Sequence, residues 1–281
     1  MTAEAQPLQS ISFDDFLDLL AVPKACEINK LIFKKMFLDA NDGKKAILDS
    51  ADKKALKDDI DKIRWLYTLK PNTINIAPYK DQEREYPEIA ILHIELAQSE
   101  RLKRIAHFIN RAIPYPLVML FTCEAGSAQN LALVLADKRI NQADKEKWVI
   151  EDSIHTRWIT LISVSSAEYE FFESLKISKL PFTNFFALYQ ALIERVVAVK
   201  CAEHSGIFSI EKAATSSQKS SSQKTSSTVR LDKLRELERL GAQRSEISNK
   251  LKNEKQMGKQ VELNTQIKKI NDEIANIQGS L

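Results

Sequence analysis

Apolar residues in the first 212 positions follow two spacings, one typical of amphipathic helices and one typical of short strands. Steps of three and four predict helices over 12–20, 27–39, 51–66, 100–112, 167–176 and 184–202. Alternating or continuous apolar runs predict strands over 73–77, 88–96, 117–123, 130–136, 148–150 and 158–163. The loops after residue 117 are too short for crossover helices, so the strands that they join should be antiparallel neighbours. We therefore expect an α+β domain with a mixed, mostly antiparallel sheet of about five strands and flanking helices.

The run 88–96 is the clearest strand of the chain. One of its faces is apolar throughout, whereas the other begins apolar and turns polar at His93 and Glu95. Because both faces are apolar at the start of the run, we expect this strand to be central in its sheet.

A Ser/Thr-rich segment separates this domain from the rest of the chain. Ten of the sixteen residues in 213–228 are Ser or Thr, and none is a large apolar residue. Such a segment has too little apolar surface to offset the entropy lost on ordering. We therefore expect a globular domain over 1–212, a flexible linker over 213–228 and a helical coiled coil over 229–281.

Residues 229–281 contain no proline and carry two aliphatic runs with heptad spacing. The runs are out of register by two residues, and Gly258 lies between them, so the helix either kinks or folds back as an antiparallel hairpin. An exposed aliphatic seam needs a partner, which can be the same chain, a second copy or another protein. The predicted seam residues are Leu237, Leu240, Ile247, Leu251, Leu263, Ile267, Ile270, Ile274, Ile277 and Leu281.

The net charge of +3 is unevenly divided along the chain. Residues 213–281 contain 13 Lys or Arg and 8 Asp or Glu, so this part carries +5, whereas the first 212 residues carry −2. A basic tail can bind a nucleic-acid backbone. A solvated helical surface of mixed charges has the same composition, so both interpretations stay open.

Several common catalytic and targeting motifs are absent from the sequence. No two of the six glycines lie within ten residues, so neither a Walker loop nor a dinucleotide fingerprint is present, and no Gly-x-Ser-x-Gly elbow occurs. The three cysteines and four histidines lack metal-ligand spacing, so we expect neither a metal nor a cofactor. The first residues do not resemble a secretory signal, and no apolar run approaches the about 20 residues of a membrane span. We therefore expect a cytoplasmic protein.

His93 and Glu95 are the one pair of side chains whose spacing suggests chemistry. They lie two residues apart on one strand face, where they can form a general acid–base pair, half of a metal site, or only a polar patch. With Glu88 at the start of the strand, they support an alternative hypothesis, a metal-dependent nuclease-like enzyme. Neither glutamate is followed two positions later by the lysine that would stabilise the attacking water, so a non-catalytic protein is favoured.

Several segments resemble one bacterial family. The runs IRWLYTLKPNTINI over 63–76, ILHIEL over 91–96 and INRAIPYP over 109–116 resemble the bacterial domain of unknown function 4391 family, and NEKQ over 253–256 and VELN over 261–264 are similar to its end. The resemblance covers nearly the whole chain, and the run over 63–76 is its specific part. Family members typically have an aliphatic or polar residue where this chain has Gly258.

The resemblance implies a cellular context and no catalytic residues. Such proteins look like companions of helicases and DNA methyltransferases in restriction-like prokaryotic defence clusters. The implied function is a non-catalytic accessory or adaptor protein of a DNA-processing or anti-phage defence complex, docking through the C-terminal coiled coil. Expected partners are a helicase or DNA methyltransferase, or a second copy of the chain, but no membrane. Besides the nuclease-like enzyme, a nucleic-acid-binding protein acting through the basic tail is the other alternative.

Overall fold

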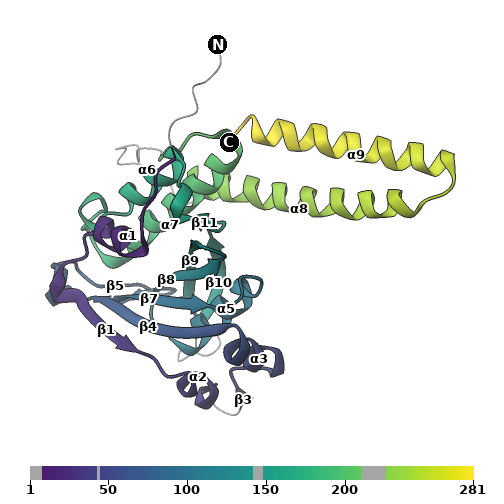
Figure 1. The fold of residues 1–281 in the computed structure, drawn as a ribbon. Helices are drawn as coiled ribbons and strands as arrows, with labels where there is room; N and C mark the ends of the chain where they lie inside the picture. Colours follow the sequence, from purple (N-terminus) through teal and green to yellow (C-terminus); the bar gives the residue numbers. More distant parts are fainter. Residues whose placement is uncertain (1–7, 43–44, 142–147, 211–225) are drawn as a thin grey trace. The chain divides into compact units, whose positions relative to one another are not determined.

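The computed structural model describes residues 8–42, 45–141, 148–210 and 226–281 (Figure 1). The chain forms two compact units, residues 1–196 and 197–281, and the boundary falls within one long helix. The predicted linker, 213–228, lies outside the described residues up to position 225, and its last three residues belong to the helix that follows.

The first unit is built around one sheet, with helices on both faces and two small hairpins (Figure 1). Its helices are α1 (Phe13–Leu20), α2 (Lys35–Asp39), α3 (Ser50–Asp58), α4 (Pro71–Ile74), α5 (Leu102–Ala112), α6 (Ser166–Ser174) and α7 (Phe185–Ser205), which continues into the second unit. The sheet strands are β1 (Glu27–Leu31), β4 (Ile60–Leu69), β7 (Ile89–Leu96), β8 (Leu117–Ala125), β9 (Ala128–Ile140), β10 (Trp148–His155) and β11 (Ile159–Thr160). The hairpins pair β2 (Asn41–Asp42) with β3 (Lys45–Ala46) and β5 (Tyr79–Lys80) with β6 (Glu85–Tyr86).

The sheet is mixed and mostly antiparallel, as the sequence predicts. The strand order is β1-β4-β7-β8-β9-β10, with β11 also pairing with β9, so β7 is central. Only β7 and β8 are parallel within the described sheet, and α5 provides the crossover between them. The strands after residue 117 are antiparallel neighbours, which confirms that prediction. The sheet has seven described strands rather than about five, because two segments predicted as helices are strands.

The prediction of one helix over 27–39 is wrong for the first half of that segment. Residues Glu27–Leu31 form the edge strand β1, which pairs with β4, and only Lys35–Asp39 are helical. Asn29 has a φ of 44°, in the left-handed region that a right-handed helix does not contain. The apolar spacing was therefore a coincidence of exposed side chains and not the buried stripe of a helix.

The segment 51–66, also predicted as one helix, ends its helix at Asp58 and then becomes β4. The strand pairs with β7 through two register shifts, one between Ile60 and Lys62 and one between Trp65 and Tyr67. Each such bulge inserts an extra residue into the strand. After the bulge, the alternation of side chains between the two faces of the sheet is shifted by one position. Buried positions recur at steps of three, as in a helix, although the first two belong to the main apolar core and the last two do not. These positions are Ile60, Ile63, Leu66 and Leu69.

The predicted strand over 73–77 is also wrong. Pro71–Ile74 form the short helix α4, with proline in its first turn, where its missing N–H is not needed. Asn75 ends the helix in a left-handed conformation, with a φ of 56°. The strand predicted over 158–163 is only partly correct, because Ile159–Thr160 form β11 and Leu161–Ser163 form a 3-10 turn. The other predicted helices and strands of the first unit are present, with ends that differ by a few residues.

The starts of α1 and α6 follow the capping rules. Ser12 caps α1 and exchanges hydrogen bonds with Asp15, and Ser165 does the same with Glu168 at α6. The even-numbered side chains of β7 pack against α3 and α5 in the main apolar core, whereas its odd-numbered face meets α1. No described helix combines the length and apolar character that a membrane span requires.

The second unit contains the end of α7 and two long helices, α8 (Ser226–Asn253) and α9 (Met257–Gln278). The two helices run antiparallel, because Lys233 near the start of α8 donates to the Ser280 carbonyl beyond the end of α9. Further along, Arg244 donates to Asn271 over 3.3 Å. The chain thus folds back, as one of the two predicted alternatives requires, and Gly258 lies in the first turn of α9.

Candidate functional site

A polar pocket of about 400 Å³ opens in the first unit between α1, β1, β4 and β7. Its base contains the buried residues Leu66 and His93, and its rim contains the exposed residues Asp14, Glu27 and Asn29. The full lining is Phe13, Asp14, Leu17, Glu27, Asn29, Arg64, Leu66, Tyr67, His93 and Glu95.

His93 is held firmly at the base of this pocket and is 8% exposed. Its Nε2 lies 2.8 Å from the Thr122 hydroxyl, and the Phe13 ring stacks on the imidazole with centroids 4.2 Å apart. Burial lowers the pKa of His93 to about 4. The imidazole is therefore neutral at neutral pH, and its second ring nitrogen, Nδ1, has no hydrogen-bond partner among the described residues.

Glu95 and Arg64 line the pocket together with His93, and each is held by a long polar contact. Lys62 Nζ lies 3.3 Å from Glu95 Oε2 at the surface, and Arg64 Nη1 donates to Asn29 Oδ1 over 3.4 Å. Asp14 and Glu27 make no ion pair within the described chain. The pocket thus holds three carboxylates and one guanidinium.

The predicted pair of His93 and Glu95 shares this pocket, but Glu88 does not line it. Glu88 lies seven residues from Glu95 along an extended strand, on the order of 23 Å at the usual rise, and its Oε2 lies 4.0 Å from Lys70 Nζ. Within the described residues, no group of three His, Cys, Asp or Glu side chains is placed to hold a metal ion. The other polar lining residues, Asp14, Glu27, Asn29, Arg64 and Tyr67, were not predicted as site residues.

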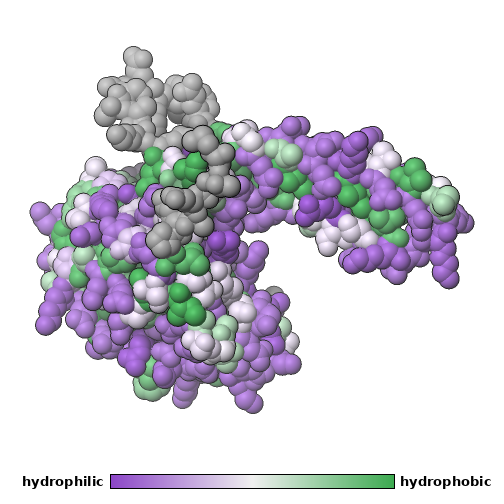
Figure 2. Space-filling view, turned by 45° about the horizontal axis from the view of Figure 1, so that its top comes forward, coloured by the Kyte–Doolittle hydropathy of each residue, from purple (hydrophilic) through white to green (hydrophobic). Residues whose placement is uncertain are grey.

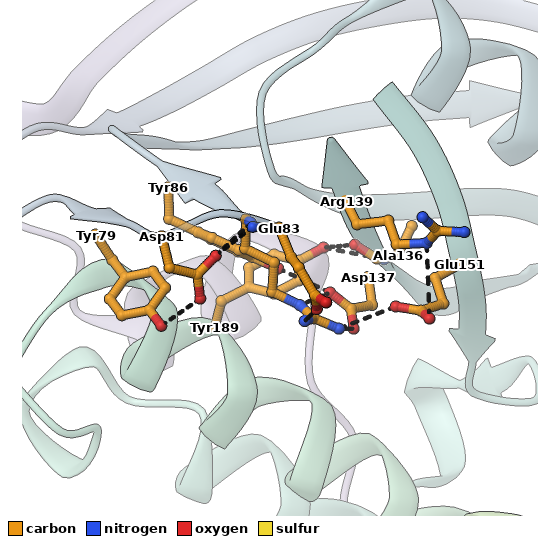
Figure 3. A network of polar contacts seen from close by, with 10 residues as sticks. Tyr79, Asp81, Glu83, Tyr86, Ala136, Asp137, Arg139, Glu151 and Tyr189 are labelled. Carbon is orange, nitrogen blue, oxygen red and sulfur yellow. Dashed lines mark hydrogen bonds and ion pairs between the residues drawn. The ribbon is translucent and has the colours of Figure 1, made fainter. Parts of the chain in front are cut away.

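A second polar cluster fixes the β5–β6 hairpin to the sheet (Figure 3). Arg84, between β5 and β6, donates to both carboxylate oxygens of Asp137 on β9, over 3.3 and 2.9 Å, and to Glu151 on β10 over 2.9 Å. Its guanidinium carbon also lies 5.8 Å from the centre of the Phe186 ring. Tyr86 adds a hydrogen bond of 3.1 Å to Asp137.

The same cluster continues into the buried core through Tyr189 on α7 (Figure 3). Its hydroxyl donates to the Leu117 carbonyl over 2.7 Å and accepts from the Ala136 N–H over 3.0 Å. Burial, then the Asp137 carboxylate, raises the pKa of Tyr86, which therefore remains a donor. Because the charged groups of this cluster already have partners, we interpret it as a structural clamp.

The α8–α9 pair is the other candidate site, because its aliphatic seam is only partly covered. Leu240, Ile247 and Ile270 are 1%, 7% and 5% exposed and form the core of the pair. Four further seam residues are only half-buried, and apolar surface remains visible along the pair between hydrophilic side chains (Figure 2). The half-buried residues packed against the core are Leu263, Ile267, Ile274 and Ile277.

The remaining seam predictions divide between buried and half-buried positions. Leu237 is buried, whereas Leu251 and Leu281 are half-buried. Leu234, at 3% exposure, is buried although it was not predicted as a seam residue. Its position three residues before Leu237 is the feature of the sequence that could have identified it as a seam residue.

The fold and these features define an α+β sheet protein that ends in a pair of antiparallel helices. The chain belongs to the family described as Domain of unknown function (DUF4391), whose sequence model matches residues 20–274. This match confirms the resemblance noted from the sequence, and it spans both compact units. No curated protein and no solved structure matches the chain significantly.

Proposed function

We propose that this protein is a non-catalytic accessory or adaptor subunit of a prokaryotic, cytoplasmic DNA-processing or anti-phage defence complex, and that it docks through the α8–α9 pair. The observation that carries the proposal is the incompletely covered aliphatic seam of that pair. The cellular context comes from the family resemblance.

The seam has the properties of a helix-docking surface. Two helices packed side by side bury only the line where they meet, so the flanks of a wide apolar stripe stay exposed until another helix covers them. The half-buried side chains of Ile267 and Ile274 lie one heptad apart on α9, as required for contact with one partner helix. That partner is a helix of a helicase or DNA methyltransferase, or α8–α9 of a second copy.

The two alternatives receive less support. Some of the basic side chains on α8 are paired with acidic neighbours one turn away, as in Arg239 with Glu236 and Lys250 with Glu246, at 2.6 Å each. This pattern is typical of a solvated helix rather than of a surface free to neutralise phosphates. For a nuclease-like enzyme, Glu88 would have to join His93 and Glu95, and it does not line their pocket.

The test is affinity purification of the tagged full chain from its own cells, followed by size-exclusion chromatography with light scattering. We expect a helicase or methyltransferase at fixed stoichiometry, or a defined homo-oligomer. The substitutions Ile270→Asp and Ile274→Asp should abolish this association, because both side chains belong to the seam.

The matched control is Asn264→Asp with Asn276→Asp, which adds the same charge at exposed positions of α9. Circular dichroism must show that helix content is retained, and Ile274→Ala provides a milder seam variant if it is not. A lone monomer, or an association that the seam variants leave unchanged, would contradict the proposal.

A further inference from the structure

The pocket at the base of α1 has a charge balance that selects one class of ligand. Three carboxylates line it, on Asp14, Glu27 and Glu95, against two positive charges, the guanidinium of Arg64 in the lining and the ammonium of Lys62, which lies 3.3 Å from Glu95. Its histidine adds no positive charge at neutral pH, because burial keeps the imidazole neutral. The lining therefore carries net negative charge, which disfavours an anionic ligand.

The carboxylates in and near the pocket act on one polar group of the lining, the Tyr67 phenol. The pKa of the Tyr67 phenol is raised, mainly by burial. The negative charges of Glu27, Asp18 and Asp14 raise it further. Tyr67 and Phe13 also present aromatic rings at the pocket, and the faces of aromatic rings attract organic cations.

His93 offers this pocket one ring nitrogen for hydrogen bonding. It is 8% exposed, it lines the pocket, and its Nε2 is engaged by Thr122. Its Nδ1 has no hydrogen-bond partner among the described residues and is not one of the fully enclosed atoms, so it is accessible to a ligand in the pocket. A neutral imidazole whose Nε2–H donates to Thr122 presents an acceptor at Nδ1, which suits a ligand N–H donor.

The spread of the carboxylates favours a large cation over a compact metal ion. No three metal-ligating side chains converge among the described residues, whereas a volume of about 400 Å³ is within the usual range for small-molecule sites. We propose that this pocket binds an organic cation, namely a primary ammonium or guanidinium group presented by a small amine or by a Lys or Arg side chain. The proposal does not depend on the docking function of α8–α9.

The proposal can be tested by titrating the full chain with agmatine and with N-acetyl-arginine amide while following the His93 ring resonances by NMR. We expect saturable shifts with both cations and none with 1,4-butanediol, a neutral molecule of similar length. Tighter binding of the capped arginine would identify a side chain as the natural source, and tighter binding of agmatine would identify a free amine.

The variant Asp14→Asn with Glu27→Gln removes two rim charges without changing side-chain size. It should weaken binding about fivefold or more. The control Asp58→Asn with Glu100→Gln removes the same charge at exposed positions outside the lining and should leave affinity unchanged. Both pairs of substitutions are at exposed sites, so folding is not at risk. No saturable shift with either cation, or equal affinity in the rim variant, would overturn the proposal.

Discussion

The Phe13 ring stacks on the His93 imidazole at an interplanar angle of 27°, with ring centroids 4.2 Å apart. This contact joins the first turn of α1 to the central strand β7, eighty residues further along the chain. It also removes the imidazole from water, which is the main reason for the lowered pKa of His93. The stability of the first unit should therefore depend on the protonation of one side chain.

We expect His93 to destabilise the protein in mild acid. Its pKa falls from 6.5 in the unfolded chain to about 4 in the folded protein, so the unfolded state binds more protons between these values. Stability is full above pH 6.5 and is lost as the pH falls toward 4. At pH 4.5 the loss should be on the order of 2 kcal/mol relative to pH 7.5. Urea unfolding at both pH values measures it.

The control for this prediction is His93→Gln, which keeps a polar partner for Thr122 but does not titrate. Its free energy of unfolding should fall less between the two pH values than that of the natural protein. Phe13→Leu should move the pKa of His93 back toward 6.5, which NMR titration of the ring reports. An unchanged pH dependence in His93→Gln would show that other groups control acid stability.

Arg84 is expected to be the most sensitive residue of the hairpin clamp. Arg84→Ala leaves the Asp137 carboxylate, 21% exposed, without its bidentate partner, and should reduce the free energy of unfolding by about 1–3 kcal/mol. Arg139→Ala is the matched control, because Arg139 Nε is 3.8 Å from the more exposed Glu151, and should cost about 0–1 kcal/mol. Equal effects of the two substitutions in chemical denaturation would argue against a clamp.

Lys138 should make the protein more stable in mild alkali. Its ammonium is 1% exposed and donates to the Ile113 and Tyr115 carbonyls over 2.7 Å each, just beyond the end of α5. Burial lowers its pKa from 10.5 to about 7, so between these values the unfolded chain binds more protons than the folded one. Stability should rise with pH through that window, by about 3 kcal/mol from pH 7 to 9.5.

The comparison protein for this prediction is Lys138→Met, which has a side chain of similar length and no titrating group. The free energy of unfolding of the natural protein should rise relative to that of the variant as the pH increases from 7 to 9.5. A constant difference between the two proteins would mean that the folded ammonium keeps its ordinary pKa.

The sequence predicted the parts of the fold whose signals are local. The helices predicted over 12–20 and 167–176 and the two-sided apolar pattern of β7 depend on neighbours within a few positions, and these features are present. The strand β4 was missed because its two bulges change the spacing of buried residues from two to three. Nothing in a single sequence distinguishes that spacing from a helix.

Only two of the ten residues that line the pocket were predicted from the sequence, for the same reason. His93 and Glu95 lie on a regular strand, so their common face follows from alternation alone. Arg64 and Tyr67 come from β4, and Glu27 comes from β1, in segments whose helical pattern was misleading. In the clamp, Arg84 binds Asp137, which is 53 positions away in the sequence, and Glu151, which is 67 positions away. Contacts at such separations leave no periodic signal in the sequence.

The irregular strand β1 has a consequence for how the protein behaves at high concentration. An edge strand usually offers a regular row of free N–H and C=O groups on which a foreign strand can assemble, which leads to fibrils. Here Asn29, with its positive φ, and the register shift between Glu27 and Lys30 interrupt that row. The sheet therefore ends in a strand that is a poor template for aggregation, even though Ile28 and Leu31 are exposed on it.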